Sequence, residues 1–224
     1  MIQPTSITRS KRKTISISIS KTGEVSVRAP MFVSDKKIED FILSKQKWIE
    51  DKLNKINANT QTFQDVINYE KLLVFGDKFT PVYSSNTKIE LDDYGKILIP
   101  AKFKTPDKVF KKTKDWYKQL ANDIIINRAI NFTKSLRLTP SKIKINDSRG
   151  RWGACNSRGE IILNFRIAML PPFLIDYVII HELSHLIEMN HSPKFWNIMS
   201  IFMPNYKKAK EQIKNYSFCL TLFN

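Results

Sequence analysis

The three histidines of this 224-residue chain all lie in one short segment, His181–His191, with the sequence HELSHLIEMNH. Histidines four residues apart project from the same face of an α-helix, so His181 and His185 can direct their ring nitrogens at one point. A helix that continued through His191 would place that residue about 15 Å further along the axis and facing elsewhere, at about 1.5 Å per residue. The spacing therefore predicts a helix that ends before His191, followed by a turn that brings the third histidine back.

The residues around His191 are typical of such a helix end. Asn190 is a residue type that tolerates the left-handed conformation, and Ser192-Pro193 does not easily extend a helix, so we expect the helix to end near Asn190. Glu188 competes with His191 for the third position because it shares the face of the first two histidines. On a straight helix it lies a turn away from a metal held between them. We therefore favour His191 and interpret Glu188 as an outer supporting residue or a solvated one.

Three neutral imidazoles beside a carboxylate are suited to a catalytic zinc site. Zinc held by three protein ligands keeps one position for water and lowers the pKa of that water towards neutrality. Glu182, adjacent to the first histidine, would be the general base that accepts the proton. The expected site is one zinc ion bound by His181, His185 and His191, with Glu182 as the catalytic residue. The alternative interpretation is an ordinary helix with hydrogen-bonded core histidines.

A hydrolytic site also needs donors that stabilise the negative charge of the transition state. The candidates for transition-state or substrate contacts are Arg149, Arg151, Arg166 and Tyr206. Arg151, next to Trp152, is the first of these to test. Each arginine also suits a solvated or ion-paired surface position, and the sequence does not place any of them.

The segments on either side of the histidines predict further helices. Pro171-Pro172 suits a first helical turn, and the apolar run 173–180 that follows predicts a helix buried in a core. After the motif, Phe195–Met199 opens an amphipathic helix, and Tyr206–Tyr216 resumes a lysine-rich helical pattern. The aromatic residues of the segment 195–202 are interpreted as core rather than as substrate contacts.

Four short motifs resemble one known family. Residues 151–155 read R-W-G-A-C, residues 159–164 fit G-x-I-x-L-N, residues 171–186 fit P-P-x-x-I-D-Y-V-I-x-H-E-L-S-H-L, and residues 190–196 fit N-H-S-P-x-F-W. Together they resemble the YgjP-like family of predicted zinc metallopeptidases, which is related to the WLM and SprT-like proteases. The resemblance is strongest over residues 146–200 and is traceable through residues 11–53. Ala154 departs from the serine expected in the first motif, but it is a loop residue and not a ligand.

The resemblance implies an α+β fold with a zincin-like catalytic domain, containing an active-site helix and a small sheet. It also implies that His181, His185 and His191 bind zinc, that Glu182 is the base, and that the substrate is a peptide or protein. In zincins an edge strand lies over the active-site helix and pairs with the extended substrate. The resemblance assigns this place to the strand Glu160–Asn164.

Alternating and helical patterns divide the chain into two expected parts. Residues 1–100 form a β-rich N-terminal region with one helix, and residues 101–224 form the zincin-like metallohydrolase domain. The expected elements are strands at Thr14–Ile19, Glu24–Arg28, Leu72–Phe75, Lys88–Leu91, Ile97–Ile99, Lys142–Ile145 and Glu160–Asn164, and helices at Ser34–Ile56, capped by Ser34 or Asp35, and Pro106–Leu136. Residues 57–64 are expected to be a polar connector.

Composition restricts the class of protein. A hydrophobic content of 42% is enough for a sizeable core, and no run of about 18 apolar residues predicts a membrane span. The first ten residues lack the apolar core of a secretion signal. The two cysteines, Cys155 and Cys219, make no disulfide framework and match a reducing compartment. We therefore expect a cytoplasmic protein without a membrane partner, and the sequence carries no indication of oligomeric state.

The formal net charge of +16 leaves two further functions open. The lysines of one segment would attract phosphate or acidic partners: Lys102, Lys104, Lys108, Lys111, Lys112, Lys114 and Lys118. One alternative is therefore a hydrolase of nucleotides or phosphoanhydrides that uses the same metal centre. The other is a nucleic-acid-associated binding protein with a structural zinc, against which Glu182 argues. We prefer to explain the charge by a general bias towards surface lysine. The ligand spacing and the family resemblance favour the metallopeptidase.

Overall fold

The computed structural model describes residues 3–20, 23–103 and 105–223, and the chain forms two compact units, Met1–Gln64 and Asp65–Asn224. Helices and separate small sheets are present in both units, which confirms the predicted α+β class. The boundary expected at residue 100 lies inside the second unit. No helix among the described residues is long and apolar enough to cross a membrane.

The first unit is a three-stranded sheet packed against a pair of helices. Its elements are β1 (Ser6–Ser10), β2 (Ser16–Ile19), β3 (Val25–Pro30), α1 (Asp35–Ser44) and α2 (Gln46–Thr62). The strand order is β1-β3-β2, with β1 parallel and β2 antiparallel to β3. The sequence did not predict β1, whose side chains are mostly exposed and therefore lack the apolar alternation that marks a strand.

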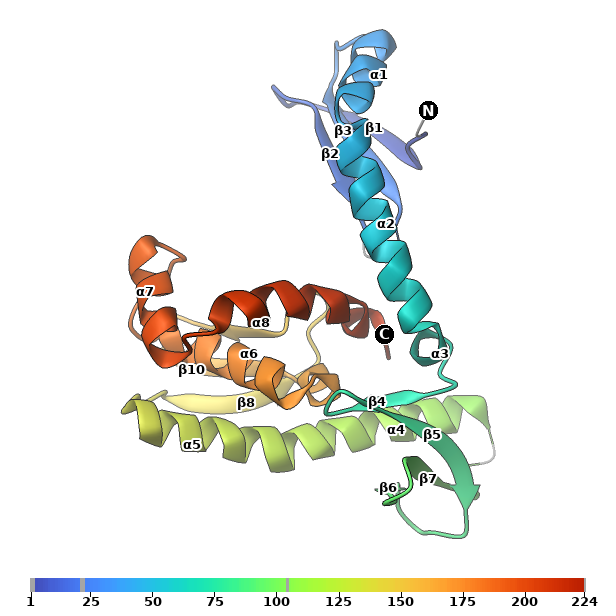
Figure 1. Cartoon of the computed structure of the whole chain (residues 1–224), viewed down its shortest axis with the longest axis vertical. Coiled ribbons are helices and arrows are strands. Elements are labelled where there is room, and N and C mark those ends of the chain that lie inside the picture. Colours follow the sequence, from blue (N-terminus) through green and yellow to red (C-terminus); the bar gives the residue numbers. More distant parts are fainter. Residues whose placement is uncertain (1–2, 21–22, 104, 224) are drawn as a thin grey trace. The chain divides into compact units, whose positions relative to one another are not determined.

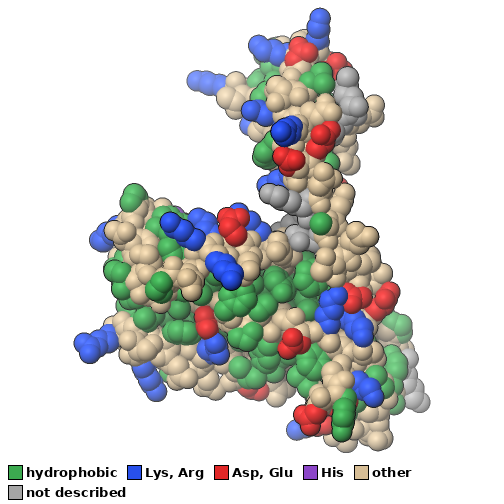
Figure 2. Space-filling model, viewed as in Figure 1, with side chains coloured by type: hydrophobic (Ala, Val, Ile, Leu, Met, Phe, Trp, Pro, Cys, Tyr) green, Lys and Arg blue, Asp and Glu red, His purple; other side chains and the backbone are tan. Residues whose placement is uncertain are grey.

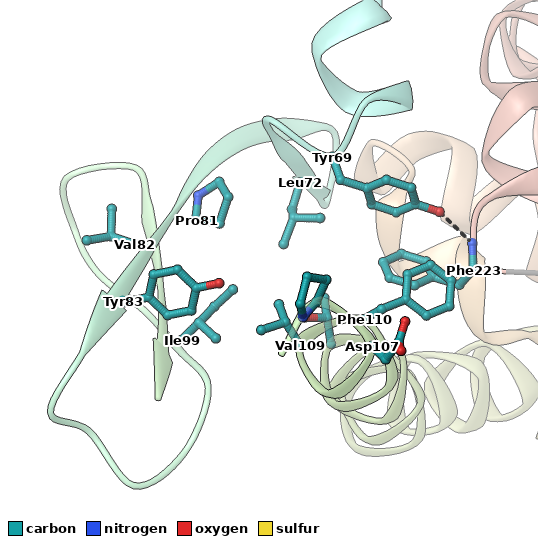
Figure 3. A pocket seen from close by; sticks show the side chains of 12 residues that line it. Tyr69, Leu72, Pro81, Val82, Tyr83, Ile99, Asp107, Val109, Phe110 and Phe223 are labelled. Carbon is teal, nitrogen blue, oxygen red and sulfur yellow. Dashed lines mark hydrogen bonds between the residues drawn. The ribbon is translucent and has the colours of Figure 1, made fainter. Parts of the chain in front are cut away.

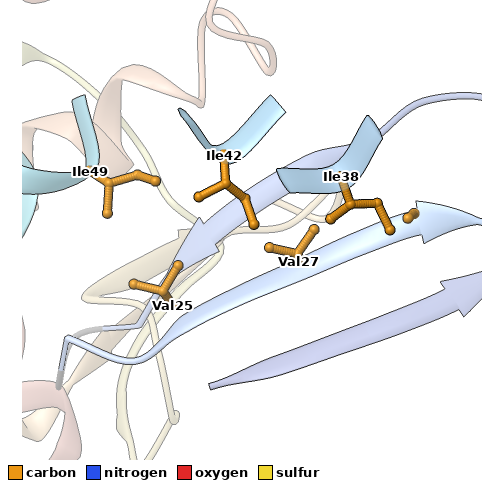
Figure 4. Packing of buried hydrophobic residues seen from close by; sticks show 6 residues of the cluster. Val25, Val27, Ile38, Ile42 and Ile49 are labelled. Atoms are coloured by element: carbon orange, nitrogen blue, oxygen red, sulfur yellow. The ribbon is translucent and has the colours of Figure 1, made fainter. Parts of the chain in front are cut away.

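The core of the first unit forms between the central strand and one face of the two helices. Val25 and Val27 alternate inward from β3, and Ile38, Ile42 and Ile49 meet them from α1 and α2 (Figure 4). Spacings of four and seven residues place these isoleucines on one side of the helices. All five side chains are buried, which explains why this small unit is compact.

The helix predicted from Ser34 to Ile56 is two helices. Ser34 caps α1 as predicted, because its hydroxyl accepts a hydrogen bond from the Lys37 N–H at 3.4 Å. At Lys45 the backbone leaves the helical region, with φ of −109°, and α2 begins at the next residue. α2 then continues to Thr62, so the prediction of a connector over residues 57–64 was wrong. Asn57, Gln61 and Thr62 are exposed on this helix, and composition alone does not distinguish such a helix from a loop.

The second unit contains two small sheets and most of the helices. One sheet has the order β4-β5-β7-β6, from β4 (Leu72–Val74), β5 (Asp77–Ser84), β6 (Glu90–Leu91) and β7 (Lys96–Pro100). The other has the order β8-β10-β9, from β8 (Lys142–Asn146), β9 (Gly153–Cys155) and β10 (Glu160–Asn164). The helices are α3 (Gln64–Ile67), α4 (Pro106–Leu120), α5 (Ile126–Leu136), α6 (Pro172–Ser184), α7 (Pro193–Phe202) and α8 (Tyr206–Gln212).

The long helix predicted over Pro106–Leu136 is present as α4 and α5, joined by a π-helical turn at Ala121–Ile125. Two short 3-10 helices complete the unit, Phe165–Met169 before α6 and Ile213–Thr221 after α8. In Figure 1, α6 runs through the second unit between α5 and α8, and it contacts both of them as well as β9 and β10. The predicted burial of this helix is therefore confirmed: nine of its residues are buried.

The hairpin of β4 and β5 belongs to the second unit because its turn is anchored beside the start of α6. The Phe75 N–H donates to the Ala168 carbonyl at 2.8 Å, and the Gly76 N–H donates to the Met169 carbonyl at 3.2 Å. Gly76 has φ of +93°, and a Cβ there would lie 2.9 Å from the Cα of Pro171. The turn therefore requires glycine both for its backbone conformation and for its close contact with Pro171.

A buried arginine joins the C-terminal end of the chain to Asp147, which directly follows β8. The guanidinium of Arg166 is fully enclosed and donates to the Leu222 carbonyl at 2.7 Å, the Phe223 carbonyl at 3.3 Å and the Asp147 carboxylate at 2.7 Å. Asp147 also pairs with Lys114 of α4 at 2.9 Å. Burial alone would raise the pKa of Asp147, but hydrogen bonds from Lys114 and Arg166 outweigh it and lower the pKa to about 2.

We expect Asp147→Asn to destabilise the protein at pH 7 and not at pH 2. The carboxyl pKa is lower in the folded chain, about 2, than the value of about 3.9 of an unfolded aspartate, so its ionised form stabilises the fold above pH 4. This contribution disappears as the pH falls from about 4 to about 2. Thermal unfolding midpoints of the two proteins should therefore differ at pH 7 and converge at low pH. The exposed Asp93→Asn is the control and should differ from the parent at neither pH.

Candidate metal centre

The end of α6 places the first two histidines. The helix ends at Ser184, so His181 lies in its last turn and His185 directly follows it. The next residues close tight turns, with the Leu186 N–H donating to the Leu183 carbonyl at 3.0 Å and the Ile187 N–H to the Ser184 carbonyl at 3.1 Å. The helix therefore ends earlier than predicted, about a turn and a half before Asn190.

Asn190 does not have the left-handed conformation that the sequence predicted. Its side-chain Oδ1 instead accepts a hydrogen bond from the Ser192 N–H at 3.0 Å. Ser192 then caps α7, accepting from the Phe195 N–H at 3.4 Å, and Pro193 occupies the first turn. The segment between α6 and α7 is thus a local polar turn, and it carries His191 back towards the end of α6.

The three histidines converge. Their ligand nitrogens all lie within 4.8 Å of one another, and Nε2 of His191 lies 2.9 Å from Nε2 of His181. Over the described parts of the chain, these three residues form the one group of His, Cys, Asp or Glu side chains close enough to hold a metal ion. Glu188 is not part of this group, and its carboxylate lies 3.6 Å from the ammonium of Lys194.

Neighbouring groups hold the rings of His185 and His191 in place. Nδ1 of His185 lies 3.0 Å from the main-chain carbonyl of Glu188, which fixes the tautomer with Nδ1–H and leaves Nε2 for a metal. The ring of Phe195 stacks on His185 at 4.5 Å between centroids, and Trp196 stacks on His191 at 5.6 Å. Glu188 therefore supports the cluster through its backbone, and α7 supplies the aromatic wall.

The surroundings of the cluster favour the uncharged forms of His181 and His191. Burial, followed by the charges of His185, His191 and Lys210, lowers the pKa of His181 to about 3. Burial also lowers the pKa of His191. The enclosed Nδ1 of His181 has no hydrogen-bond partner among the described residues. Three imidazoles with converging nitrogens are a donor set that fits a zinc ion.

Glu182 projects from the same end of α6 towards β9. Its side chain is only 7% exposed, and burial raises its pKa to about 8, against the opposing effect of Arg151. A Cβ on Gly153 would lie 2.6 Å from Cγ and 2.7 Å from Oε1 of Glu182. Glycine at 153 therefore provides the space in which the carboxylate lies. The sequence analysis included this glycine only as part of the R-W-G-A-C motif and assigned no role to it.

The structure brings only some of the candidate contact residues to the cluster. Arg151 is close enough to Glu182 to lower its pKa, whereas Arg149 lies exposed in the preceding loop. Tyr206 stacks on Trp196 with 5.5 Å between centroids, and Trp196 in turn stacks on His191. Arg166 cannot face a substrate because it is enclosed by its contacts with Asp147 and the C-terminal carbonyls.

Tyr177 is a residue of the site that the sequence analysis missed. It precedes His181 by one turn of α6, and the two ring centroids lie 5.8 Å apart. Burial raises the pKa of Tyr177 to about 12, with smaller contributions from Glu182 and Tyr206. The spacing of four residues before the first histidine already placed it on the same helix face. Lys210, 3.8 Å from the centre of the Trp196 ring, had no such signal because it comes from α8.

The edge strand of the second sheet is not the strand that the resemblance indicated. β10 lies in the middle, paired with β8 on one side and with β9 on the other. β8 and β9 are the two edge strands, and β9 contacts α6. The assignment of the edge to Glu160–Asn164 was wrong because the turn at Asn156–Gly159 folds the short segment 153–155 along its outer side.

The comparison with protein families matches the chain to the YgjP-like metallopeptidase domain over residues 13–216. The chain belongs to the YgjP-like metallopeptidase family. The matched region includes the histidine cluster and most of both units. The family assignment made from the short motifs is therefore confirmed, together with the metallopeptidase class.

Among solved structures, the chain is similar to the metallopeptidase zymogen of Pyrococcus abyssi abylysin. The identity is 21% and the TM-score 0.36, over 40% of this chain and 91% of the other. The comparison with curated proteins gives no significant match.

We expect Gly153→Ala to reduce turnover severely without unfolding the protein. The added methyl group would overlap Glu182, so the carboxylate has to leave its place while the histidines keep theirs. A fall in kcat of at least about tenfold, with unchanged metal content and thermal midpoint, is the expected result. Ala154→Ser is the matched control, since neighbouring residues of a strand face opposite sides. Full activity of Gly153→Ala would contradict the assigned role of this glycine.

Proposed function

We propose that the chain is a zinc-dependent metallopeptidase in which His181, His185 and His191 bind one zinc ion and Glu182 is the general base. The observation that carries this proposal is the convergence of three imidazoles beside a buried carboxyl group that is one residue from the first histidine. The family is a metallopeptidase family, which supports peptide-bond hydrolysis as the reaction. Zinc is preferred over other ions because three histidines suit it and leave a position for water.

A zinc ion at this site would act as a Lewis acid on the attacking water and on the substrate carbonyl. Glu182 accepts a proton from the attacking water and then delivers it to the leaving amine, which needs a carboxylate within hydrogen-bond reach of both. Its position against Gly153 holds it in one orientation. Tyr177 and Arg151, which both interact with Glu182, are the proposed donors to the transition state, and Tyr206 is the third candidate.

The edge strand β9 is the proposed place where the substrate backbone binds. Its inner side pairs with β10, and the outer side has no strand beside it in the described sheet. An extended peptide that pairs with this outer side would lie next to Glu182, because Gly153 belongs to the same strand. Recognition through the main chain orients the scissile bond without selecting side chains.

The basic surface does not favour a nucleotide substrate. Of the lysines predicted to form a phosphate-attracting segment, Lys114 and Lys118 contact Asp147 at 2.9 and 3.4 Å, and Lys112 lies 4.0 Å from Asp115. Lys104 lies outside the described residues. On the face of the second unit drawn in Figure 2, lysine and arginine side chains are dispersed among acidic and hydrophobic ones. A peptide or protein remains the favoured substrate.

We expect Glu182→Gln to retain zinc and lose turnover. Glutamine fills the same space but cannot accept a proton, and loss of a general base reduces rates by about 10²–10⁴-fold. His185→Ala should lose both zinc and activity. Elemental analysis of the purified proteins and cleavage of unfolded casein by gel assay measure the two properties.

The controls separate the proposal from its alternatives. Lys208→Gln, an exposed lysine of α8, is the matched control variant and should keep zinc and activity. Unfolded proteins, short peptides and nucleoside triphosphates should be offered side by side to the parent protein. Hydrolysis of triphosphates but not of peptides, or parent-like turnover by Glu182→Gln, would overturn the proposed function.

A further inference from the structure

An apolar pocket lies in the second unit between the sheet β4-β5-β7-β6 and α4. Its volume is about 540 Å³, within the range of about 300–1,000 Å³ that ligand pockets have. Leu72 of β4, Ile99 of β7, and Val109 and Phe110 of α4 line it (Figure 3). A cavity of this size accepts one large aromatic or aliphatic side chain together with part of the backbone that carries it.

One end of the pocket is an aromatic wall. Phe110 lies 5.7 Å from Tyr69 and 5.1 Å from Phe223 between ring centroids, and Tyr69 lies 5.3 Å from Phe223. The Tyr69 hydroxyl is fixed because it accepts the Phe223 N–H at 3.0 Å, as Figure 3 shows. Packed, mostly edge-to-face rings favour a further aromatic ring beside them.

Beside the pocket, β5 has an open edge. The Thr80 N–H donates to the Gly95 carbonyl and the Ala101 N–H donates to the Ser84 carbonyl, so even-numbered residues of the strand face β7. The main-chain groups of Pro81 and Tyr83 therefore face the other side, because they alternate along a strand. β4 pairs only with Asp77–Phe79, and within the described sheet no strand pairs with the remaining part of this edge. Pro81 and Tyr83 also line the pocket.

Two polar side chains that line the pocket have no partner among the residues that the structure describes. Thr113 is 2% exposed, and its Oγ1 has no hydrogen-bond partner in the described part of the chain. A buried hydroxyl without a partner is uncommon in folded proteins and indicates a group that something else completes. Asp107 is the charged residue among the described residues that line the pocket, and its exposed carboxylate has no ion pair with another described residue. It would complement a cation.

The pocket lies at the opposite end of α6 from the metal centre. The β4–β5 turn contacts Pro171 at the start of the helix, whereas His181 and His185 lie at its other end. The 13 residues of α6 extend over about 20 Å, so at least about six extended residues are needed to connect the two sites. Figure 1 shows β5 and α7 at opposite ends of the second unit.

We propose that the pocket and the open edge of β5 form a docking site for an extended segment of the polypeptide substrate, at least about six residues from the scissile bond. The segment places an aromatic side chain among Leu72, Val109 and Phe110 and pairs its backbone with Tyr83. A basic residue of the segment contacts Asp107. This inference rests on the proposed peptidase function for the identity of the segment, and the binding of a peptide is measured separately from its cleavage.

Binding is tested with a fluorescein-labelled threonine-rich peptide of about ten residues that contains one phenylalanine and, two residues later, one arginine. Fluorescence anisotropy is measured on Glu182→Gln, which prevents cleavage. Replacing the peptide's phenylalanine with serine should weaken binding at least about tenfold. Thr113→Val should weaken it about fivefold without lowering the thermal midpoint, since the hydroxyl has no partner to lose. Equal affinity of both peptides, or of both proteins, would overturn the docking site.

The contact between Asp107 and a basic residue of the peptide is tested by combining a change in the protein with a change in the peptide. Asp107→Asn should weaken binding of the arginine peptide about two- to threefold and leave a peptide with glutamine in place of arginine unaffected. Asp115→Asn, on the same helix and outside this pocket, is the matched control. Equal effects of Asp107→Asn on both peptides would overturn the assignment of a basic residue to this place.

A cleavage assay tests whether the docked segment belongs to the substrate. In a protein with native Glu182, a long substrate carrying the docking segment should have a KM about fivefold higher with Thr113→Val, and a short substrate without the segment should be unaffected. Cleavage of both substrates with no difference between the proteins would overturn the docking proposal and leave the peptidase function intact. Peptide binding without cleavage of either substrate would overturn the substrate assignment together with the proposed function.

Discussion

The end of α6 at Ser184 is the constraint on which the histidine cluster depends. If the helix continued, the third histidine would lie too far along its axis to meet the first two. Tight turns and the hydrogen bond between Nδ1 of His185 and the Glu188 carbonyl end the helix, so the side chain of a proposed ligand also holds the turn that brings His191 back. α7 then adds Phe195 against His185. Ligand geometry and chain direction are fixed by the same few contacts.

The second requirement is space for a buried carboxylate. Glu182 is enclosed at the end of an otherwise apolar helix, and enclosing a charged group has a cost unless protein or metal compensates for it. β9 approaches so closely that only glycine fits at 153. The same edge strand therefore positions the carboxylate, and its outer side is the proposed binding place of the substrate backbone. Arg151, just before this strand, adds a positive charge near the carboxylate.

Much of the site was predictable because it is local in sequence. The spacing of the histidines implied that two of them share a helix face and that a turn must bring back the third, and Glu182 is adjacent to the first. The helix cap at Ser34 and the helices that begin with proline were predictable from the residue types preferred at helix starts. The predictions failed where distant segments meet. The sequence placed Arg166 among the site candidates, whereas the structure encloses it against Asp147 and the C-terminal carbonyls. It placed the substrate edge at Glu160–Asn164, and the shorter β9 occupies that edge.

The sequence by itself determined the family, the α+β class and the three histidines of the cluster, because the residue types and their helical spacing all lie within one short segment. Only the tertiary structure decided that Gly153 makes room for Glu182, that Tyr177 and Lys210 flank the histidines, and that β5 leaves an open edge beside an apolar pocket. These features depend on which side chains are brought together across long stretches of chain. Packing between distant segments decides such contacts, and a local pattern of residues does not predict them.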